Sequence, residues 1–280
     1  MRLVIMVCMK VEQQKIENFK KIVWDYYKKE GRGMPWRSTR DPYKIVISEV
    51  MLQQTQVSRV LKKYPEFIKE FPTFKTLADA PVSKLLKVWS GMGYNRRALY
   101  LKALSRIVVD RYKGRLPDDP KTLVQFPAVG SATAGSIIAF SYNVPTVFIE
   151  TNIRRVFIHF FFGNKSNIND TDILPLVAKT VDKKNPREWY FALMDYGSNL
   201  GKQVINPNRK SRHYHKQKVF EGSDRKIRGE ILKILLKSKK VTKEDLHNKL
   251  NQDRGRIVKI ISALTKEGFL SEINGTYHLQ

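Results

Sequence analysis

Apolar residues recur at the spacing of amphipathic helices through most of the chain. Between residues 13 and 113 this spacing predicts helices over residues 16–29, 43–57, 57–71, 82–92 and 96–112. A short helix at 122–125 follows, and further helices are expected at 131–140, 151–162, 174–181 and 186–200. Because strands are hard to find in this part, the pattern indicates a mostly α-helical fold.

The pattern changes after residue 201. Residues 202–223 are polar and basic with little apolar period, which indicates a basic linker or irregular arm. From 224 to 280 three helices are expected, at 227–238, 241–250 and 254–270, followed by a hairpin with an Asn274-Gly275 turn. This order predicts a winged helix-turn-helix, with an unrelated helical appendix as the alternative. We therefore expect two domains, residues 1–223 and 224–280.

The first ten residues, MRLVIMVCMK, are apolar but too few for a secretory signal, and we expect a strand there. No apolar run is long enough for a membrane span. The chain has a single cysteine, Cys8, so no intrachain disulfide, structural zinc site or all-cysteine iron–sulfur cluster is expected. We expect no metal or other cofactor, although His213 and His215 offer an alternative metal site. The expected location is cytoplasmic, with the nucleoid, or nuclear in a cell that has a nucleus.

Net charge narrows the class of partner. The sequence has 52 Lys and Arg residues against 26 Asp and Glu residues, a net charge of +26. Neutralising a nucleic-acid phosphate releases condensed counterions, so a polyanionic partner is expected. A generally basic protein is the alternative. A hydrophobic content of 42% predicts a folded core rather than disorder.

The stretch FPAVGSATAG, residues 126–135, is rich in glycine and small residues between two predicted helices. Such a turn lets backbone N–H groups approach an anion, and the following helix adds its unpaired amides and positive dipole end. The segment 119–141 therefore predicts a helix-hairpin-helix that grips a phosphate without reading a base. An ordinary closely packed helix turn is the alternative.

Two carboxylates indicate a specific chemistry beside that hairpin. Glu49 interrupts an apolar helical stretch, and Glu150 follows an apolar run just before a helix. Breaking an N-glycosidic bond builds positive charge on the sugar, so one acid can protonate the leaving base while a second carboxylate stabilises the cation and directs water. A structural ion pair with one of the many arginines is the alternative for each.

The sequence resembles the helix-hairpin-helix (HhH-GPD) DNA glycosylases, most closely the MutY adenine glycosylases. The resemblance lies in motifs that occur in family order, namely PWR at 35–37, DPYKIVISEVMLQQTQV at 41–57, VWSGMGYNRRA at 88–98, FPAVGSATAGSI at 126–137, ETNIRRV at 150–156 and ALMDYG at 192–197. It implies two helical subdomains with a cleft, followed here by the winged helix. It also implies a monomer acting on double-stranded DNA that contains a mismatch or lesion.

The resemblance implies roles for matching residues. Glu49 would protonate the purine and then activate water, and Glu150 would take the place of the catalytic aspartate. Gln54 would intercalate near the space left by a flipped base, and Tyr94 would wedge beside the opposing base. Val129 and Gly130 would bind a phosphate through their amides. The remaining implied base or DNA contacts are Trp36, Arg37, Gln53, Thr55, Ser131, Ala132, Thr133 and Asn152.

Four departures from the family pattern matter. Glu150 replaces an aspartate, which moves the carboxylate by about 1.5 Å. Ala132 stands where lyase-competent relatives have a lysine, so a monofunctional glycosylase is expected. The cysteines of the 4Fe–4S cluster are missing, which resembles a clusterless form of the family. In such a form, side-chain packing and basic residues would take over the structural and phosphate-binding roles of the cluster, here Lys202, Arg209, Lys210 and Arg212. The domain that inspects 8-oxoguanine is also missing.

These departures leave the target open. Excision of adenine opposite 8-oxoguanine or guanine is the first expectation. Excision of thymine or uracil opposite guanine is an alternative, to which the apolar Tyr190-Phe191 pair adds weight. The third reading is a protein that binds damaged DNA without catalysis.

Overall fold

The computed structural model describes residues 2–216, 219–238 and 240–280, with side chains from residue 12 onward. Contacts divide the chain into two compact units. Unit 1 comprises Met1–Arg40, Asp118–Pro120 and Gly130–Lys216, and unit 2 comprises Asp41–Pro117, Lys121–Val129 and Gln217–Gln280. None of the described helices is long and apolar enough to cross a bilayer. The mostly α-helical class is confirmed, while the domain boundary at residue 224 stays a prediction.

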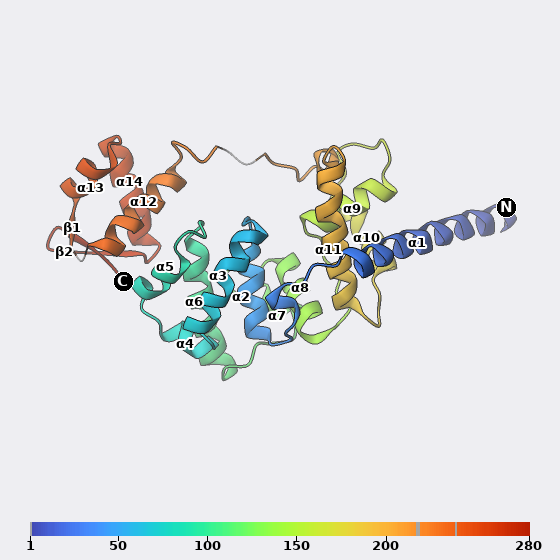
Figure 1. Ribbon diagram of the computed structural model, residues 1–280, viewed down its shortest axis with the longest axis horizontal. Helices are drawn as coiled ribbons and strands as arrows, with labels where there is room; N and C mark the ends of the chain where they lie inside the picture. The colour runs from blue at the N-terminus through green and yellow to red at the C-terminus, as the bar shows by residue number, and fades with distance from the viewer. Residues whose placement is uncertain (1, 217–218, 239) are drawn as a thin grey trace. The chain divides into compact units, whose positions relative to one another are not determined.

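Unit 1 is built on three packed helices. α11 (Pro186–Gln203) lies against α1 (Arg2–Glu30) and against α9 (Thr151–Phe161), as Figure 1 shows. Phe19 of α1 is buried at the centre, with its ring about 5–6 Å from those of Phe157 and Trp189. The expected N-terminal strand was wrong, because the backbone is helical from Arg2.

The other elements of unit 1 surround this core. α10 (Asp170–Thr180) begins with a capping box between Asn169 and Asp172 and packs on α9. α8 (Ser131–Tyr142) contacts α11, and two single turns, η1 (Pro35–Arg37) and η2 (Pro207–Lys210), complete the unit. The basic arm expected at 202–223 thus includes the end of α11 and η2, while its residues 217 and 218 lie outside the described residues.

The helical part of unit 2 contains α2 (Pro42–Leu52), α3 (Val57–Glu70), α4 (Phe74–Asp79), α5 (Val82–Trp89), α6 (Arg96–Tyr112) and α7 (Pro120–Leu123), the last beginning at the edge of unit 1. Trp89 is fully buried beside the ring of Phe67. The sequence pattern did not predict α4, which a Thr73–Thr76 capping box starts. The helix expected at 43–57 ends at Leu52, where the chain makes a turn before α3.

The C-terminal segment, residues 224–280, also belongs to unit 2. It runs α12 (Asp224–Lys237), β1 (Val241–Thr242), α13 (Lys243–Leu250), α14 (Arg254–Lys266), β2 (Leu270–Ile273) and β3 (Thr276–Leu279). The antiparallel sheet has the order β1-β3-β2, with Leu270 opposite Leu279 and Val241 opposite Tyr277. Positive φ angles at Asn274 and Gly275 form the predicted hairpin turn. The classification of this segment as a winged helix stays a prediction.

Candidate DNA-contacting and catalytic residues

A buried arginine in unit 2 connects two turns that carry predicted DNA contacts. Arg97 of α6 is only 7% exposed, and its Nη1 donates to the carbonyls of Val50 and Met51 at 2.9 Å and to that of Gln53. Its Nη2 donates to Thr55 Oγ1 at 2.9 Å and to the carbonyl of Gly93 at 3.1 Å. Arg97 therefore satisfies the carbonyls at the end of α2 and fixes both turns to one another.

Both turns hold a residue in the left-handed region. Gln54 has a φ of 52° and is exposed, and Tyr94 has a φ of 46° and is half-buried. A non-glycine residue in this region costs about 1–2 kcal/mol, so each turn depends on contacts that hold it. Burial lowers the pKa of Arg97 to about 10, which leaves the guanidinium charged at neutral pH. The signal for Arg97 in the sequence was a charged residue on the apolar face of a predicted helix.

Glu49 and Gln53 lie on and just after α2. Glu49 is the half-buried position in the otherwise buried run from 45 to 51, so α2 presents a carboxyl group in an apolar setting. Gln53 ends the helix, and its Nε2 donates to the carbonyl of Ala128 at 2.9 Å. That bond ties the turn after α2 to the turn before α8, inside unit 2.

The predicted phosphate-binding hairpin divides into a turn and a helix start. The Val129 amide donates to the carbonyl of Phe126 at 3.1 Å, and the side chain of Val129 is buried, so this amide already serves the turn. Gly130 is the N-cap of α8 and is exposed, and no side chain caps this helix. Ser131 is exposed, and Ala132 and Thr133 are half-buried at the first turn. The amides that begin α8, rather than that of Val129, are therefore the candidates for the predicted phosphate contact.

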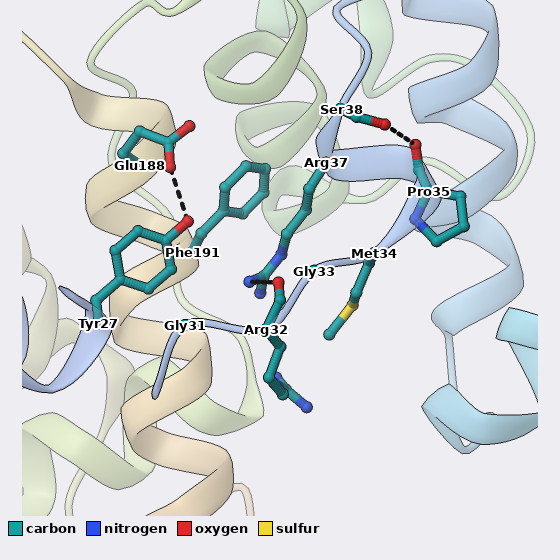
Figure 2. A pocket seen from close by; sticks show the side chains of 10 residues that line it. All are labelled: Tyr27, Gly31, Arg32, Gly33, Met34, Pro35, Arg37, Ser38, Glu188 and Phe191. Atoms are coloured by element: carbon teal, nitrogen blue, oxygen red, sulfur yellow. Dashed lines mark hydrogen bonds between the residues drawn. The ribbon is translucent and has the colours of Figure 1, made fainter. Parts of the chain in front are cut away.

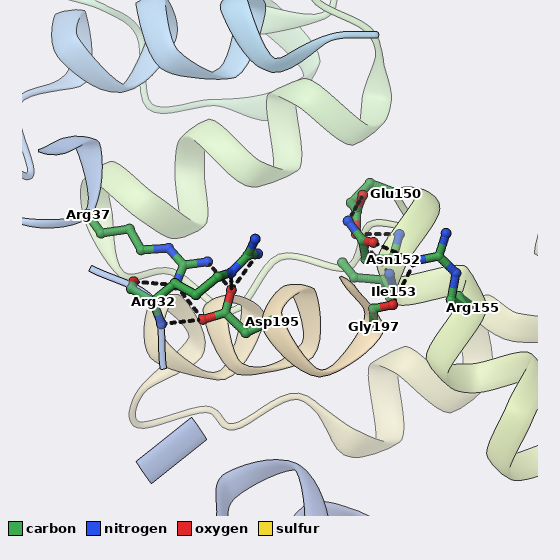
Figure 3. Close-up of polar contacts among 8 residues, drawn as sticks. All are labelled: Arg32, Arg37, Glu150, Asn152, Ile153, Arg155, Asp195 and Gly197. Carbon is green, nitrogen blue, oxygen red and sulfur yellow. Dashed lines mark hydrogen bonds and ion pairs between the residues drawn. The ribbon is translucent and has the colours of Figure 1, made fainter. Parts of the chain in front are cut away.

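Glu150 of unit 1 holds its carboxylate at the start of α9. As N-cap, its Oε1 accepts hydrogen bonds from the amides of Asn152 at 2.7 Å and Ile153 at 2.8 Å (Figure 3). N-caps are usually formed by shorter side chains such as aspartate. The two hydrogen bonds show that the extra methylene of Glu150 does not prevent capping. Burial raises the pKa of Glu150, and the two amide hydrogen bonds oppose that rise.

A network behind Glu150 fixes α9 against α11. Asn152 donates from Nδ2 to Glu150 Oε2 at 3.2 Å and accepts at Oδ1 from Arg155 Nη1 at 2.9 Å. Arg155 Nη1 also donates to the carbonyl of Gly197 at 2.6 Å. A Cβ on Gly197 would lie 2.4 Å from the carbonyl oxygen of Asn152, so only glycine permits this approach. The sequence pattern gave no role to Arg155 or Gly197.

The segment around η2 packs on the same helix. Asn208 is buried and donates from Nδ2 to the carbonyl of Thr151 at 2.9 Å, and Lys210 Nζ donates to the carbonyl of Gly163 at 2.6 Å.

A 4Fe–4S cluster needs thiolate ligands. Residues 202–223 contain no cysteine and do not fit such a cluster. Among described residues no three His, Cys, Asp or Glu side chains form a group that would hold a metal, and His213 contacts Asn169.

A pocket of about 660 Å³ opens in unit 1 beside α11 (Figure 2). Arg37 lines it, stacks 4.5 Å over the ring of Phe191 and donates from Nη1 and Nη2 to both oxygens of Asp195 at 2.8 Å. Trp36 is buried and does not line this pocket. Asp195, the acid of ALMDYG, has a fully buried side chain and also pairs with Arg32, so it sets the position of Arg37 (Figure 3).

The two units together contain the predicted site residues, in separate groups. Unit 2 holds Glu49 and the turns at Gln54 and Tyr94, and unit 1 holds Glu150 with its network and the start of α8. The turn before α8, the start of α8 and the two carboxyl groups are the elements that the sequence predicts for a helix-hairpin-helix DNA glycosylase.

Comparison with known proteins identifies the family. The profile described as "HhH-GPD superfamily base excision DNA repair protein" matches residues 47–174. An adenine DNA glycosylase of Buchnera aphidicola subsp. Baizongia pistaciae is 36% identical over 64% of this chain and 52% of its own length, and a thymine/uracil-DNA glycosylase of Methanothermobacter thermautotrophicus is 30% identical over 64% and 83%. A solved thermostable thymine-DNA glycosylase superposes with a TM-score of 0.63 at 29% identity, over 67% of this chain and 88% of its own.

These similarities confirm the resemblance to the HhH-GPD DNA glycosylases and the mostly α-helical fold that the sequence predicted. The chain belongs to the HhH-GPD superfamily of base excision DNA repair proteins. It spans about half the length of the Buchnera adenine glycosylases that it matches.

Proposed function

We propose that the protein is a monofunctional DNA glycosylase that hydrolyses the bond between deoxyribose and a mispaired adenine in double-stranded DNA, opposite 8-oxoguanine or guanine. The observation that carries the proposal is the Glu150 carboxylate fixed at the start of α9 by two amides. A carboxylate held in place before the reaction can stabilise a cationic sugar without reorganising. The name of the Buchnera relative supports adenine as the target.

The chemistry divides the steps between the two acids. Glu49 donates a proton to the leaving base, the C1′–N bond breaks with its electron pair going to the base, and positive charge develops on the sugar. The Glu150 carboxylate stabilises that charge while water attacks C1′ and gives its proton to the Glu49 carboxylate, which restores the acid. Ala132 offers no amine for a Schiff base, so the product is an intact abasic strand.

The remaining predicted contacts position the DNA. The amides from Gly130 onward at the start of α8 bind a backbone phosphate, and the left-handed turns at Gln54 and Tyr94 enter the duplex where the base has been flipped out. Trp36 is buried next to Arg37 in sequence, and its proposed part is to help shape the base pocket. In this proposal the protein acts as a monomer on chromosomal DNA, in the cytoplasm or, in a cell that has one, in the nucleus.

Thymine or uracil opposite guanine is the second candidate target. The observation in its favour is the apolar side chain of Phe191 in the wall of the unit 1 pocket. The similarity to the Methanothermobacter thymine/uracil-DNA glycosylase, which covers 83% of that protein's length, points the same way. Tyr190 does not add a polar group, because it is buried and its hydroxyl donates to the carbonyl of Thr146.

Single-turnover excision tests the proposal. Duplexes would carry adenine opposite 8-oxoguanine, adenine opposite guanine, and thymine opposite guanine, each with and without alkali afterwards. We expect strand cleavage at adenine that depends on alkali and disappears in Glu49→Gln. Cleavage only at thymine would favour the second candidate, and tight binding without cleavage of any duplex would favour a non-catalytic DNA-binding protein.

A further inference from the structure

The C-terminal segment contacts the tyrosine that the proposed function places beside the opposing base. Arg225, in the first turn of α12, donates from Nη1 to the Tyr94 hydroxyl at 2.6 Å. The same guanidinium lies 5.5 Å from the centre of the Tyr94 ring and 5.9 Å from that of Phe220. Both Arg225 and Tyr94 are half-buried. A residue 131 positions away in sequence therefore fixes the end of this side chain.

A second contact holds the segment at that place. Glu267, which follows α14, accepts hydrogen bonds from Arg96 of α6 and from Arg228 of α12. Its side chain is 17% exposed. Burial acts to raise the pKa of Glu267, but the hydrogen bonds from Arg96 and Arg228 outweigh it and lower the pKa, so the carboxylate stays charged. α12 also packs on α5, within unit 2.

The backbone turn and the hydroxyl of Tyr94 are held by different residues. Arg97 binds the carbonyls of Met92 and Gly93, which fixes the left-handed turn, and its guanidinium lies 5.5 Å from the Tyr94 ring. The phenol oxygen at the far end of the ring is held by Arg225. A side chain that probes an opposing base must keep a fixed orientation, because loss of orientation equalises its contacts with different bases.

We propose that Arg225 is a positioning residue for Tyr94, through which the C-terminal segment sets how strongly the protein distinguishes the bases opposite its target. This inference rests on the proposed function, in which Tyr94 lies beside the opposing base. The segment then acts in base discrimination without touching the excised base. Glu267 contributes by keeping α12 beside the Tyr94 turn.

The test measures binding, not cleavage. Equilibrium affinities would be determined for duplexes with a non-cleavable tetrahydrofuran abasic site opposite guanine, 8-oxoguanine, cytosine or adenine. We expect the wild type to prefer one opposing base, and Arg225→Met to reduce that preference about tenfold, the size expected for loss of a charge-assisted hydrogen bond. Arg225→Lys should recover part of the preference, and Glu267→Gln should reduce it. Lys233→Met removes one charge from an exposed position of the same helix and should weaken binding to all duplexes equally.

A double-mutant cycle makes the test specific. Tyr94→Phe keeps the ring and removes the hydroxyl, so Arg225→Met should have little further effect on the preference in that background. Additive effects, an unchanged preference in Arg225→Met, or no preference in the wild type would each overturn the inference. Because no bond is cleaved, a protein that excises no base from any duplex overturns the proposed function alone, and the binding preferences still decide the role of Arg225. Melting curves of each variant identify any that fail to fold.

Discussion

At the scale of single residues, Glu150 caps α9, and the proposed function gives it a chemical task with a different requirement. Capping α9 needs only an acceptor oxygen, whereas stabilising a cationic sugar needs a negative charge. Because burial raises its pKa, the ionised form is less favourable in the folded chain than in the unfolded chain. The charge of Glu150 is therefore kept at a cost in stability, which is the pattern expected of a functional group.

Replacing Glu150 separates these tasks. Glu150→Gln keeps an acceptor for the Asn152 and Ile153 amides, so the melting temperature at neutral pH should not fall, while single-turnover excision should drop by about 10²–10³-fold. Glu150→Asp restores the charge and should retain more activity than Glu150→Gln. Equal activity of the two variants would show that the charge is not used.

The raised pKa of Glu150 also predicts a pH dependence. As pH falls through this raised pKa the carboxylate becomes protonated, so the excision rate should decline at a pH above the ordinary range of a glutamate. Single-turnover rates measured from acid to neutral pH test this, with Glu150→Asp as the comparison. A rate that stays constant over this range, when chemistry limits it, contradicts the assignment of Glu150.

The same shift predicts the direction of the stability change. A carboxyl whose pKa is higher in the folded state binds its proton more tightly there. Protonation of Glu150 therefore increases the free energy of unfolding as pH falls from the raised pKa of the folded state toward the ordinary pKa of the unfolded state. That gain is lost again as pH rises. Denaturant unfolding of wild type and Glu150→Gln at two pH values in that window isolates the effect, because the variant lacks the titration.

At the scale of elements, the end of α2 shows what local patterns omit. The apolar period suggested a helix through residue 57, yet the chain leaves the helix at Leu52. The reason lies in α6, where Arg97 takes up the carbonyls that the helix would have bonded. The hairpin 119–141 was predictable because its signal is a run of small residues within one turn. The pairing of Arg37 with Asp195 was not, because it joins residues 158 positions apart.

Removing Arg97 should therefore disturb two turns at once. Arg97→Met leaves several buried carbonyls without a donor, and we expect a loss of about 3 kcal/mol in the free energy of unfolding. Arg97→Lys keeps the charge but cannot span both turns, so it should recover only part of this. Denaturant unfolding measures the change. Arg111→Met, at an exposed position of the same helix, is the matched control and should change stability little. A loss no larger than that of the control contradicts the role of Arg97.

At the scale of the whole molecule, the net charge of +26 comes from 52 cations, few of which contact the proposed catalytic groups. Arg37, Arg97, Arg154 and Arg187 are largely committed to internal contacts, whereas most lysines are exposed. In the proposed function, the exposed cations would therefore supply affinity for the phosphate backbone, while the fixed arginines hold the geometry of the protein. The make-up of the two compact units was not predictable from composition, because unit 2 draws its residues from three separate stretches of chain.

The salt dependence of DNA binding and a variant with one added negative charge test whether affinity and geometry come from different cations. The logarithm of the affinity for duplex DNA should fall linearly with the logarithm of salt concentration, with a slope of about −0.9 for each phosphate contact.

Ser131→Asp places a negative charge at the first position of α8, where the helix dipole favours it but a bound phosphate does not. We therefore expect the melting temperature to stay the same or rise, while DNA affinity drops about tenfold and the slope becomes shallower by about one contact. Ser83→Asp, an exposed serine in the first turn of α5, is the matched control and should leave the slope unchanged. If both variants bind DNA like the wild type, the start of α8 does not hold a phosphate, and the affinity comes from the exposed cations alone.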